Sequence, residues 1–256
     1  MSVGQEDDRT SRLQALEAER AALRADLQHF AYAVSHDLRA PLRHIVSYAQ
    51  LVQEDAGGQL SDEVQGFLRT MTDSARHMGT QLDGLAAWAR VGTVELQPQF
   101  VDLHDLVRAL QQSPVCQAGP GVQWELASDL PTVWADPNLL RQALEHVLGN
   151  AVKFSAGQAA ARIAIAPWRE HTRGLTGLRV QDHGAGYNPA QQAHLFKVFG
   201  RLHSPQQFPG IGMGLVITRR IMERLGGQVS IASSGVGQGA VVTVGLPTQQ
   251  SDRNPS

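Results

Sequence analysis

The chain has 256 residues, enough for one or two domains with hydrophobic cores of their own. Its 22 basic and 24 acidic residues leave a net charge of −2, which gives no reason to expect a nucleic-acid or anionic-membrane partner. With a single cysteine, Cys116, no signal peptide and no apolar run near the roughly 20 residues of a membrane helix, the sequence is typical of a cytoplasmic protein.

The first part of the chain is helical in pattern. Residues 1–29 form a tail, expected to be disordered over its first ten residues, and a coiled-coil lead-in. Large apolar residues recur at spacings of three and four, with Arg20 occupying one slot: Leu13, Leu16, Leu23, Leu27, Phe30 and Val34. The glycines within 54–63 end this helix, and Ser61 is placed to cap a second one.

The second helix has an apolar face of its own: Val64, Phe67, Leu68, Met71, Met78, Leu82, Leu85 and Trp88. Two long helices around a short loop form an antiparallel hairpin with more apolar surface than one copy can bury. We therefore predict that residues 30–95 form a dimerisation domain, in which two copies of the chain build a four-helix bundle.

Beyond Pro98 the pattern changes to strands alternating with helices. Strands are predicted at 122–126, 161–166, 177–182, 228–233 and 239–246. Helices are predicted at 102–112, 137–153, 190–198 and 214–226, with Asp136 and Pro137 opening the second of them. Residues 96–248 are therefore expected to form an α/β domain, and 249–256 a disordered tail.

The end of the helix from Pro137 carries Asn150 and Lys153 three residues apart, on one helix edge. An amide oxygen and an ammonium group there suit a magnesium-bound triphosphate, because Mg²⁺ takes hard oxygen ligands and the lysine offsets phosphate charge. The alternative is a surface helix end at which the lysine interacts favourably with the negative end of the helix dipole.

The stretch 180–188 delivers Asp182 at the end of a strand, followed by Gly184 and Gly186. The glycines let the backbone approach a ligand closely. A carboxylate at the base of a cleft can accept the amine of adenine, whereas guanine presents a carbonyl there. The alternative is a capped glycine turn.

The stretch 209–220 places Gly210, Gly212 and Gly214 before a helix, where free backbone N–H groups can hold phosphate oxygens. The spacing is neither that of a dinucleotide-binding loop nor that of a P-loop. The alternative is a flexible loop ahead of a helix.

Together and in this order, the three stretches resemble the ATP-binding (Bergerat) fold of the GHKL superfamily, an α/β sandwich shared by histidine kinases, DNA gyrase, MutL proteins and heat-shock chaperone ATPases. Asn150, Lys153 and Phe154 resemble its asparagine box, and 195–199, ending at Phe199, its "LFxxF" box. The two glycine boxes correspond to Asp182, Gly184 and Gly186, and to Gly210, Gly212, Gly214 and the following Leu215. Residues 200–209 would be the ATP lid.

Within that superfamily, "SHDLRAPLR" resembles the phospho-acceptor box of sensor histidine kinases, most of all those of bacterial phytochromes. The resemblance covers residues 30–247 and implies that His36 is phosphorylated from Mg-ATP and passes the phosphoryl group to an aspartate of a separate response regulator. It also implies a homodimer. The coiled coil from Ser11 would be the input lever, where a sensor partner docks or a sensor domain has been lost.

The helix pattern supports this assignment of His36. The apolar seam runs through Phe30 and Val34, so His36 is predicted to face solvent, where a mobile ATP-carrying domain can reach it. A neutral imidazole keeps a lone pair for attack on phosphorus, and Asp37 can accept the other ring proton. Pro41 removes a helical hydrogen bond, and the resulting bend would act as a hinge.

Two positions depart from the family pattern: His146 stands where a second asparagine is usual, and His183 follows Asp182. We expect His146 to take part in nucleotide binding, because it lies one helical turn before Asn150; the alternative is a histidine turned into the helix–sheet core. The alternatives are a GHKL ATPase that hydrolyses ATP, as gyrase does, and a dimeric scaffold without catalysis.

Overall fold

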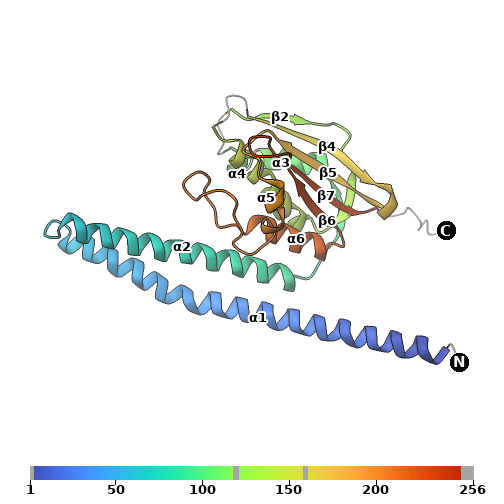
Figure 1. Cartoon of the computed structure of the whole chain (residues 1–256), viewed down its shortest axis with the longest axis horizontal. Helices are drawn as coiled ribbons and strands as arrows, with labels where there is room; N and C mark the ends of the chain where they lie inside the picture. Colours follow the sequence, from blue (N-terminus) through green and yellow to red (C-terminus); the bar gives the residue numbers. More distant parts are fainter. Residues whose placement is uncertain (1–2, 118–120, 158–160, 249–256) are drawn as a thin grey trace. The chain divides into compact units, whose positions relative to one another are not determined.

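The computed structural model describes residues 3–117, 121–157 and 161–248. The chain divides into two compact units, Met1–Thr93 and Val94–Ser256 (Figure 1). The tail predicted to be disordered, 249–256, lies outside the described residues. No helix in the described ranges is long and apolar enough to cross a membrane.

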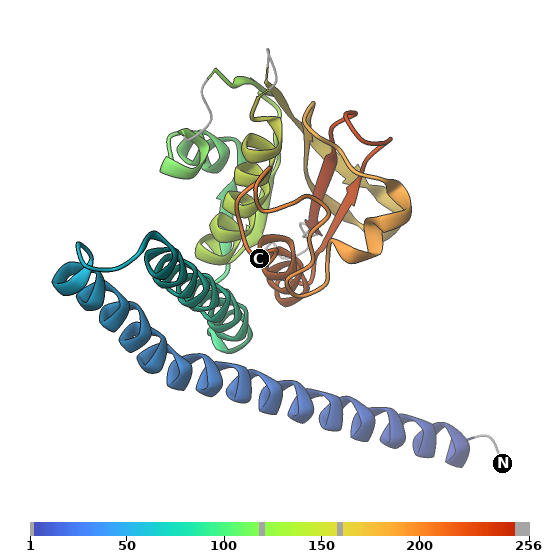
Figure 2. The same cartoon turned by 60° about the vertical axis from the view of Figure 1, so that its left-hand side comes forward.

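The first unit is a helical hairpin, formed by α1 (Val3–Ala56) and α2 (Asp62–Thr93) (Figures 1 and 2). The backbone N–H of Val64 donates to Oγ of Ser61 at 3.3 Å, which confirms the predicted cap. The expectation that the first ten residues are disordered is wrong from Val3 onward.

Pro41 lies inside α1, and the helix continues through it. Proline removes one hydrogen bond and crowds one carbonyl, but the turns before and after it stay helical in this long element. The use of this position as a hinge remains a prediction.

The fully buried side chains of α1 and α2 are small or polar, whereas the large apolar residues Val34, Leu68, Leu82, Leu85 and Trp88 are only partly buried. The buried members are Gln28, Ala31, Ser35 and Ala49 on α1, and Thr72, Ala75, Gly84, Ala86, Ala89 and Val91 on α2. The apolar seam faces outward in the single chain, with Leu16, Leu23, Leu27, Phe30, Phe67 and Met71 all exposed. Small residues let the two helices approach closely, and the large ones are left for another surface.

The second unit is built on a five-stranded mixed sheet of order β2-β4-β5-β7-β6. Its strands are β2 (Gln123–Leu126), β4 (Arg162–Glu170), β5 (Leu175–Asp182), β6 (Gln228–Ala232) and β7 (Val241–Pro247). Only β2 and β4 pair in parallel, and the other pairs are antiparallel. In β5, Arg179 and Gln181 are exposed while Leu178 and Val180 are buried, as in a sheet covered on one face.

Helices α3 (Leu103–Gln111), α5 (Pro137–Ser155) and α6 (Gly214–Arg224) form the second layer (Figure 2). The core between the layers joins α5 to the sheet through fully buried side chains: Leu140, Leu144, Leu148, Ile163, Ile165, Leu178 and Leu246. Asp136 caps α5, accepting from the N–H groups of Asn138 and Leu139 at 3.0 Å each. The hairpin followed by an α/β sandwich confirms the predicted fold class.

Several local predictions are wrong. Strands β1 (Gln99–Asp102) and β3 (Thr132–Ala135) form a separate antiparallel pair that was not predicted from the sequence. The short helices α4 (Pro114–Gln117) and η1 (His171–Arg173) were also missed. The helix expected at 190–198 is a 3₁₀ helix, η2 (Pro189–His194), whose residues are all exposed and offer no apolar face to pack.

Candidate functional site

His36 lies on the solvent side of α1, with 68% of its side chain exposed, as predicted. Its neighbour Ser35 is fully buried against α2 and donates to the carbonyl of Ala31 at 2.7 Å. Because one residue rotates the helix by about 100°, the buried Ser35 fixes the outward direction of His36.

Asp37 orients the imidazole. Nδ1 of His36 lies 3.2 Å from Oδ1 of Asp37. A carboxylate can only accept, so Nδ1 carries the proton and Nε2 keeps the lone pair. The exposed nitrogen is therefore the nucleophilic one.

In the second unit, α5 presents His146, Asn150, Lys153 and Phe154 near its end, all partly buried. Nζ of Lys153 lies 4.2 Å from the centre of the Phe154 ring. Burial lowers the pKa of the Lys153 ammonium to about 8, and the positive charge of Arg201 acts in the same direction.

His146 has a ring nitrogen, Nε2, that is buried and has no hydrogen-bond partner. Burial lowers the pKa of His146, while the carboxylate of Glu145 acts against this. An orphaned polar atom in a buried position is costly, so it marks a place where a ligand or water is expected.

Asp182 ends β5 and is 6% exposed. Its Oδ1 accepts from the N–H groups of Gly184 at 2.9 Å and Ala240 at 3.2 Å, which leaves Oδ2 for a ligand. Burial raises the pKa of Asp182, and these two hydrogen bonds partly offset the rise.

The first glycine box is hydrogen-bonded to the last turn of α5. The N–H of Ala185 donates to the carbonyl of Phe154 at 2.9 Å, and a Cβ on Gly184 would overlap that carbonyl. Gly186 has φ of 55°, where a side chain would be strained. These glycines are thus required by the close approach of two backbones.

The second glycine box lies against the same helix edge. A Cβ on Gly210 would stand 3.6 Å from Nζ of Lys153, and one on Gly214 would stand 3.6 Å from Nδ1 of His146. Gly214 begins α6, whose N-terminus has no side-chain cap. Its first backbone N–H groups are therefore available to an anion.

The segment between the boxes, predicted as a lid, is held by the predicted residue Phe154 and by Arg201, His203 and Phe208, which sequence reasoning missed. The rings of Phe154, His203 and Phe208 form a cluster with centroids 5.0–5.5 Å apart. Nε2 of His203 donates to the carbonyl of Gly186 at 2.9 Å. Arg201 donates to the carbonyls of Phe208 at 2.6 Å and of Gly210.

The remaining predicted site residues contribute in other ways. Leu215 is partly buried and packs against the core cluster. Phe199 is 37% exposed and has φ of 58°, the one positive φ of a non-glycine residue in the described ranges. Nδ1 of His183 lies 3.2 Å from the backbone carbonyl of Arg162, so this contact is with β4 and not with α5 or the glycine boxes.

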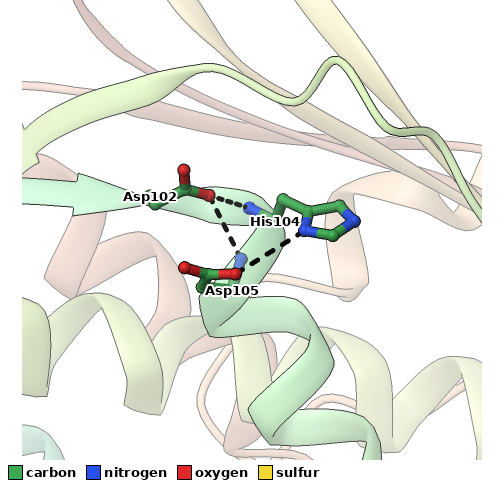
Figure 3. A group of neighbouring side chains, drawn as sticks. All are labelled: Asp102, His104 and Asp105. Carbon is green, nitrogen blue, oxygen red and sulfur yellow. Dashed lines mark hydrogen bonds and ion pairs between the residues drawn. The ribbon is translucent and has the colours of Figure 1, made fainter.

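A separate group of metal-ligand types occurs at the start of α3 (Figure 3). Asp102, His104 and Asp105 form the one such group of three in the described residues. Oδ1 of Asp102 already accepts from the N–H groups of His104 at 2.8 Å and Asp105 at 3.1 Å. The side chain of Asp102 is therefore the N-cap of α3, and this role explains the group.

An exposed histidine on a helical hairpin, followed by an α/β sandwich with two glycine boxes against one helix edge, defines the catalytic core of a sensor histidine kinase. Residues 26–93 match the family model "His Kinase A (phospho-acceptor) domain". Residues 135–250 match "Histidine kinase-, DNA gyrase B-, and HSP90-like ATPase". The chain belongs to the histidine kinases.

Among relatives, the phytochrome-like protein Cph1 of Synechocystis is 32% identical over 87% of this chain and 29% of its own length. The methanogenesis regulatory histidine kinase FilI of Methanothrix harundinacea is 31% identical over 89% of this chain and 25% of its own. The chain therefore spans less than a third of these relatives. The predicted likeness to phytochrome-type kinases is confirmed.

Solved structures agree with the fold. Full-length ShkA in complex with AMPPNP has a TM-score of 0.59 and 28% identity, covering 86% of this chain and 45% of that one. The histidine kinase AdeS of Acinetobacter baumannii has a TM-score of 0.54 at 18% identity, covering 84% of this chain and 98% of that one.

Proposed function

We propose that this chain is an ATP-dependent protein histidine kinase that phosphorylates His36 and passes the phosphoryl group to an aspartate of a separate response regulator. The observation that carries the proposal is the exposed His36, held by Asp37 in the tautomer with a free Nε2, on a chain that also carries the ATPase domain.

ATP would bind between α5, the two glycine boxes and the lid. Oδ2 of Asp182 would accept the adenine amine. The glycines 210–214 and the uncapped start of α6 would hold phosphate oxygens, and Lys153 would offset their charge. The AMPPNP bound in the ShkA structure supports a nucleotide at this kind of domain.

The residues also fit a magnesium ion. Asn150 offers an amide oxygen on the edge of α5 between His146, with its orphaned Nε2, and Lys153. We assign Asn150 as the protein ligand for Mg²⁺, which when bound neutralises charge on the β- and γ-phosphates.

In the transfer step, Nε2 of His36 attacks the γ-phosphorus. The N–P bond forms as the bond to the bridging oxygen breaks, and ADP leaves with that electron pair. The proton on Nδ1 stays hydrogen-bonded to Asp37, whose charge offsets that of the phosphorylated ring. In a second transfer, a carboxylate oxygen of the regulator's aspartate would attack the phosphorus. The new P–O bond would form as the P–N bond breaks, and Nε2 of His36 would recover its electron pair.

We further propose that the chain works as a homodimer through the outward apolar face of the hairpin, and that an upstream sensor acts through the N-terminal part of α1. The support is the row of exposed large side chains on both helices, which a four-helix bundle would cover.

Incubation with radiolabelled ATP and Mg²⁺ tests the kinase activity. We expect label on the native protein that resists alkali and is lost in acid, and none on His36→Ala. The matched control is His77→Ala, which alters another exposed histidine of the hairpin and should keep full labelling. Release of free phosphate without protein labelling would instead indicate an ATPase, and nucleotide binding without either would indicate a scaffold.

A further inference from the structure

A pocket of about 250 Å³ adjoins His36 within the hairpin. It is lined by Tyr32, His36 and Arg39 of α1 and by Ala86 and Arg90 of α2. Residues four apart share a helix face, so Tyr32 lies one turn before His36, and Ala86 and Arg90 stand one above the other. Ala86 is 2% exposed, and its small side chain leaves the space open.

The two arginines of the pocket differ in their partners. Arg39 donates to Oδ1 of Asp83 at 3.0 Å, so its charge is already offset within the hairpin. Arg90 makes no ion pair with any of the described residues. The pocket therefore brings a guanidinium without an ion-pair partner in the described part of the chain together with the side chain of His36.

We propose that this pocket receives the phosphoryl group once it is on Nε2 of His36, and that Arg90 holds it there by charge-assisted hydrogen bonds. The inference rests on the proposed function and adds a binding residue outside the acceptor box and the ATP site. A guanidinium suits the role, because its paired N–H groups match two oxygens of a phosphoryl group. Tyr32 adds a hydroxyl at the pocket wall.

Holding the group in this way would lengthen the life of the phosphorylated state. The bound phosphoryl is a dianion, whereas the transition state for its loss is metaphosphate-like, with its charge spread and partly returned to the leaving group. Arg90 therefore stabilises the phosphohistidine more than the transition state. It disfavours loss to water and return to ADP until a regulator contacts the group.

The test phosphorylates the full-length chain chemically with phosphoramidate, so that it does not depend on the ATP site. We compare the native protein with Arg90→Ala, Arg90→Lys and the control Arg69→Ala, which removes another exposed arginine of α2. The rate of loss at His36 is followed by mass spectrometry at neutral pH, and the ³¹P resonance of phosphohistidine is titrated.

We expect Arg90→Ala to lose the phosphoryl group about threefold to tenfold faster than the native protein, the range of an exposed to partly buried charge pair. Its phosphoryl pKa should rise, since a nearby cation favours the dianion. The rate of loss in Arg90→Lys should lie between the rates of the native protein and Arg90→Ala, and the rate in Arg69→Ala should match the native rate.

Equal lifetimes and equal ³¹P titrations in Arg90→Ala and the native protein would overturn the proposal. A faster loss in Arg69→Ala of the same size would also overturn it, because the effect would then be one of general charge or helix stability. If the native protein takes no label from ATP, the proposed kinase activity fails, while the phosphoramidate experiment still decides the role of Arg90.

Discussion

Lys153 and His146 occupy the same edge of α5, and burial lowers the pKa of both side chains. The two side chains nevertheless lose their protons in different pH ranges. The pKa of Lys153 is about 8, whereas the pKa of His146 lies below its ordinary value of about 6.5. Nucleotide affinity should therefore change in two separate windows, each tied to one residue.

Above neutrality, we expect affinity for a non-hydrolysable ATP analogue to weaken. Lys153 loses its positive charge as the pH rises through about 8, and with it the attraction to the triphosphate. Calorimetry between pH 7 and 9.5 should show about a threefold to tenfold loss. Lys153→Met should bind weakly throughout with a flat profile, while the exposed Lys197→Met should follow the native curve. A native curve that stays flat would contradict the prediction.

Below neutrality, the predicted role of His146 gives the same sign, because ATP affinity again decreases as the pH rises. Protonation adds a positive charge beside the phosphates, so its contribution strengthens ATP binding as the pH falls toward 6, and bound ATP in turn raises the histidine pKa. Burial of His146 moves this gain toward the acid end of the window. Comparison with His146→Asn cancels the titration of ATP itself. If the two proteins show the same pH dependence, His146 only packs between α5 and Gly214.

At the scale of elements, two glycines differ in whether the packing around them leaves room for a side chain. A Cβ on Gly177 of β5 would overlap the carbonyl of Val244 on β7, so the two strands need that glycine. Gly66 of α2 has nothing within 4 Å of such a Cβ in the single chain. The same substitution should therefore have opposite effects in the two units.

We expect Gly177→Ala to destabilise the second unit by about 2 kcal/mol or more, because the strand pair must separate to admit the methyl group. Gly66→Ala should stabilise the hairpin by about 0.5–1 kcal/mol, since alanine is the better helix former. Denaturant unfolding followed by circular dichroism measures both, and Gly66→Ala serves as the control for substitution itself. Equal stability of Gly177→Ala and the native protein would show that β5 and β7 yield without cost.

At the scale of the whole molecule, the exposed seam of the hairpin is the feature that a single chain leaves unexplained. Phe30 is 67% exposed and Phe67 is 59% exposed, and both belong to rows of large apolar side chains. Because the interior of the hairpin is closed by small residues, these rows can be buried only against another surface.

We expect light scattering at micromolar concentration to give twice the mass of the chain. Phe67→Glu should weaken this dimer at least tenfold, because a charge would then be buried in the bundle. Phe100→Glu is the matched control, since Phe100 is also well exposed, at 68%, but lies in the second unit. A native monomer, or equal weakening by both variants, would count against a dimer through the hairpin.

The sequence by itself determined the helical hairpin, the exposure of His36, the five strands of the main sheet and the order of the glycine boxes. These depend on local patterns: apolar periodicity, caps, and glycine where a backbone must come close. Sequence periodicity could not say which face of α1 packs inside the hairpin. Tertiary packing assigned that place to Ala31 and Ser35 and left the larger Phe30 outside.

Only the tertiary structure decided the pairing of β1 with β3, the aromatic cluster at His203, the hydrogen bonds of Arg201 within the predicted lid and the pocket between His36 and Arg90. Each of these joins residues that are distant in sequence or that lie on different elements. Their side chains carry no periodic signal, because the partners are chosen by where the chain folds back rather than by spacing along it.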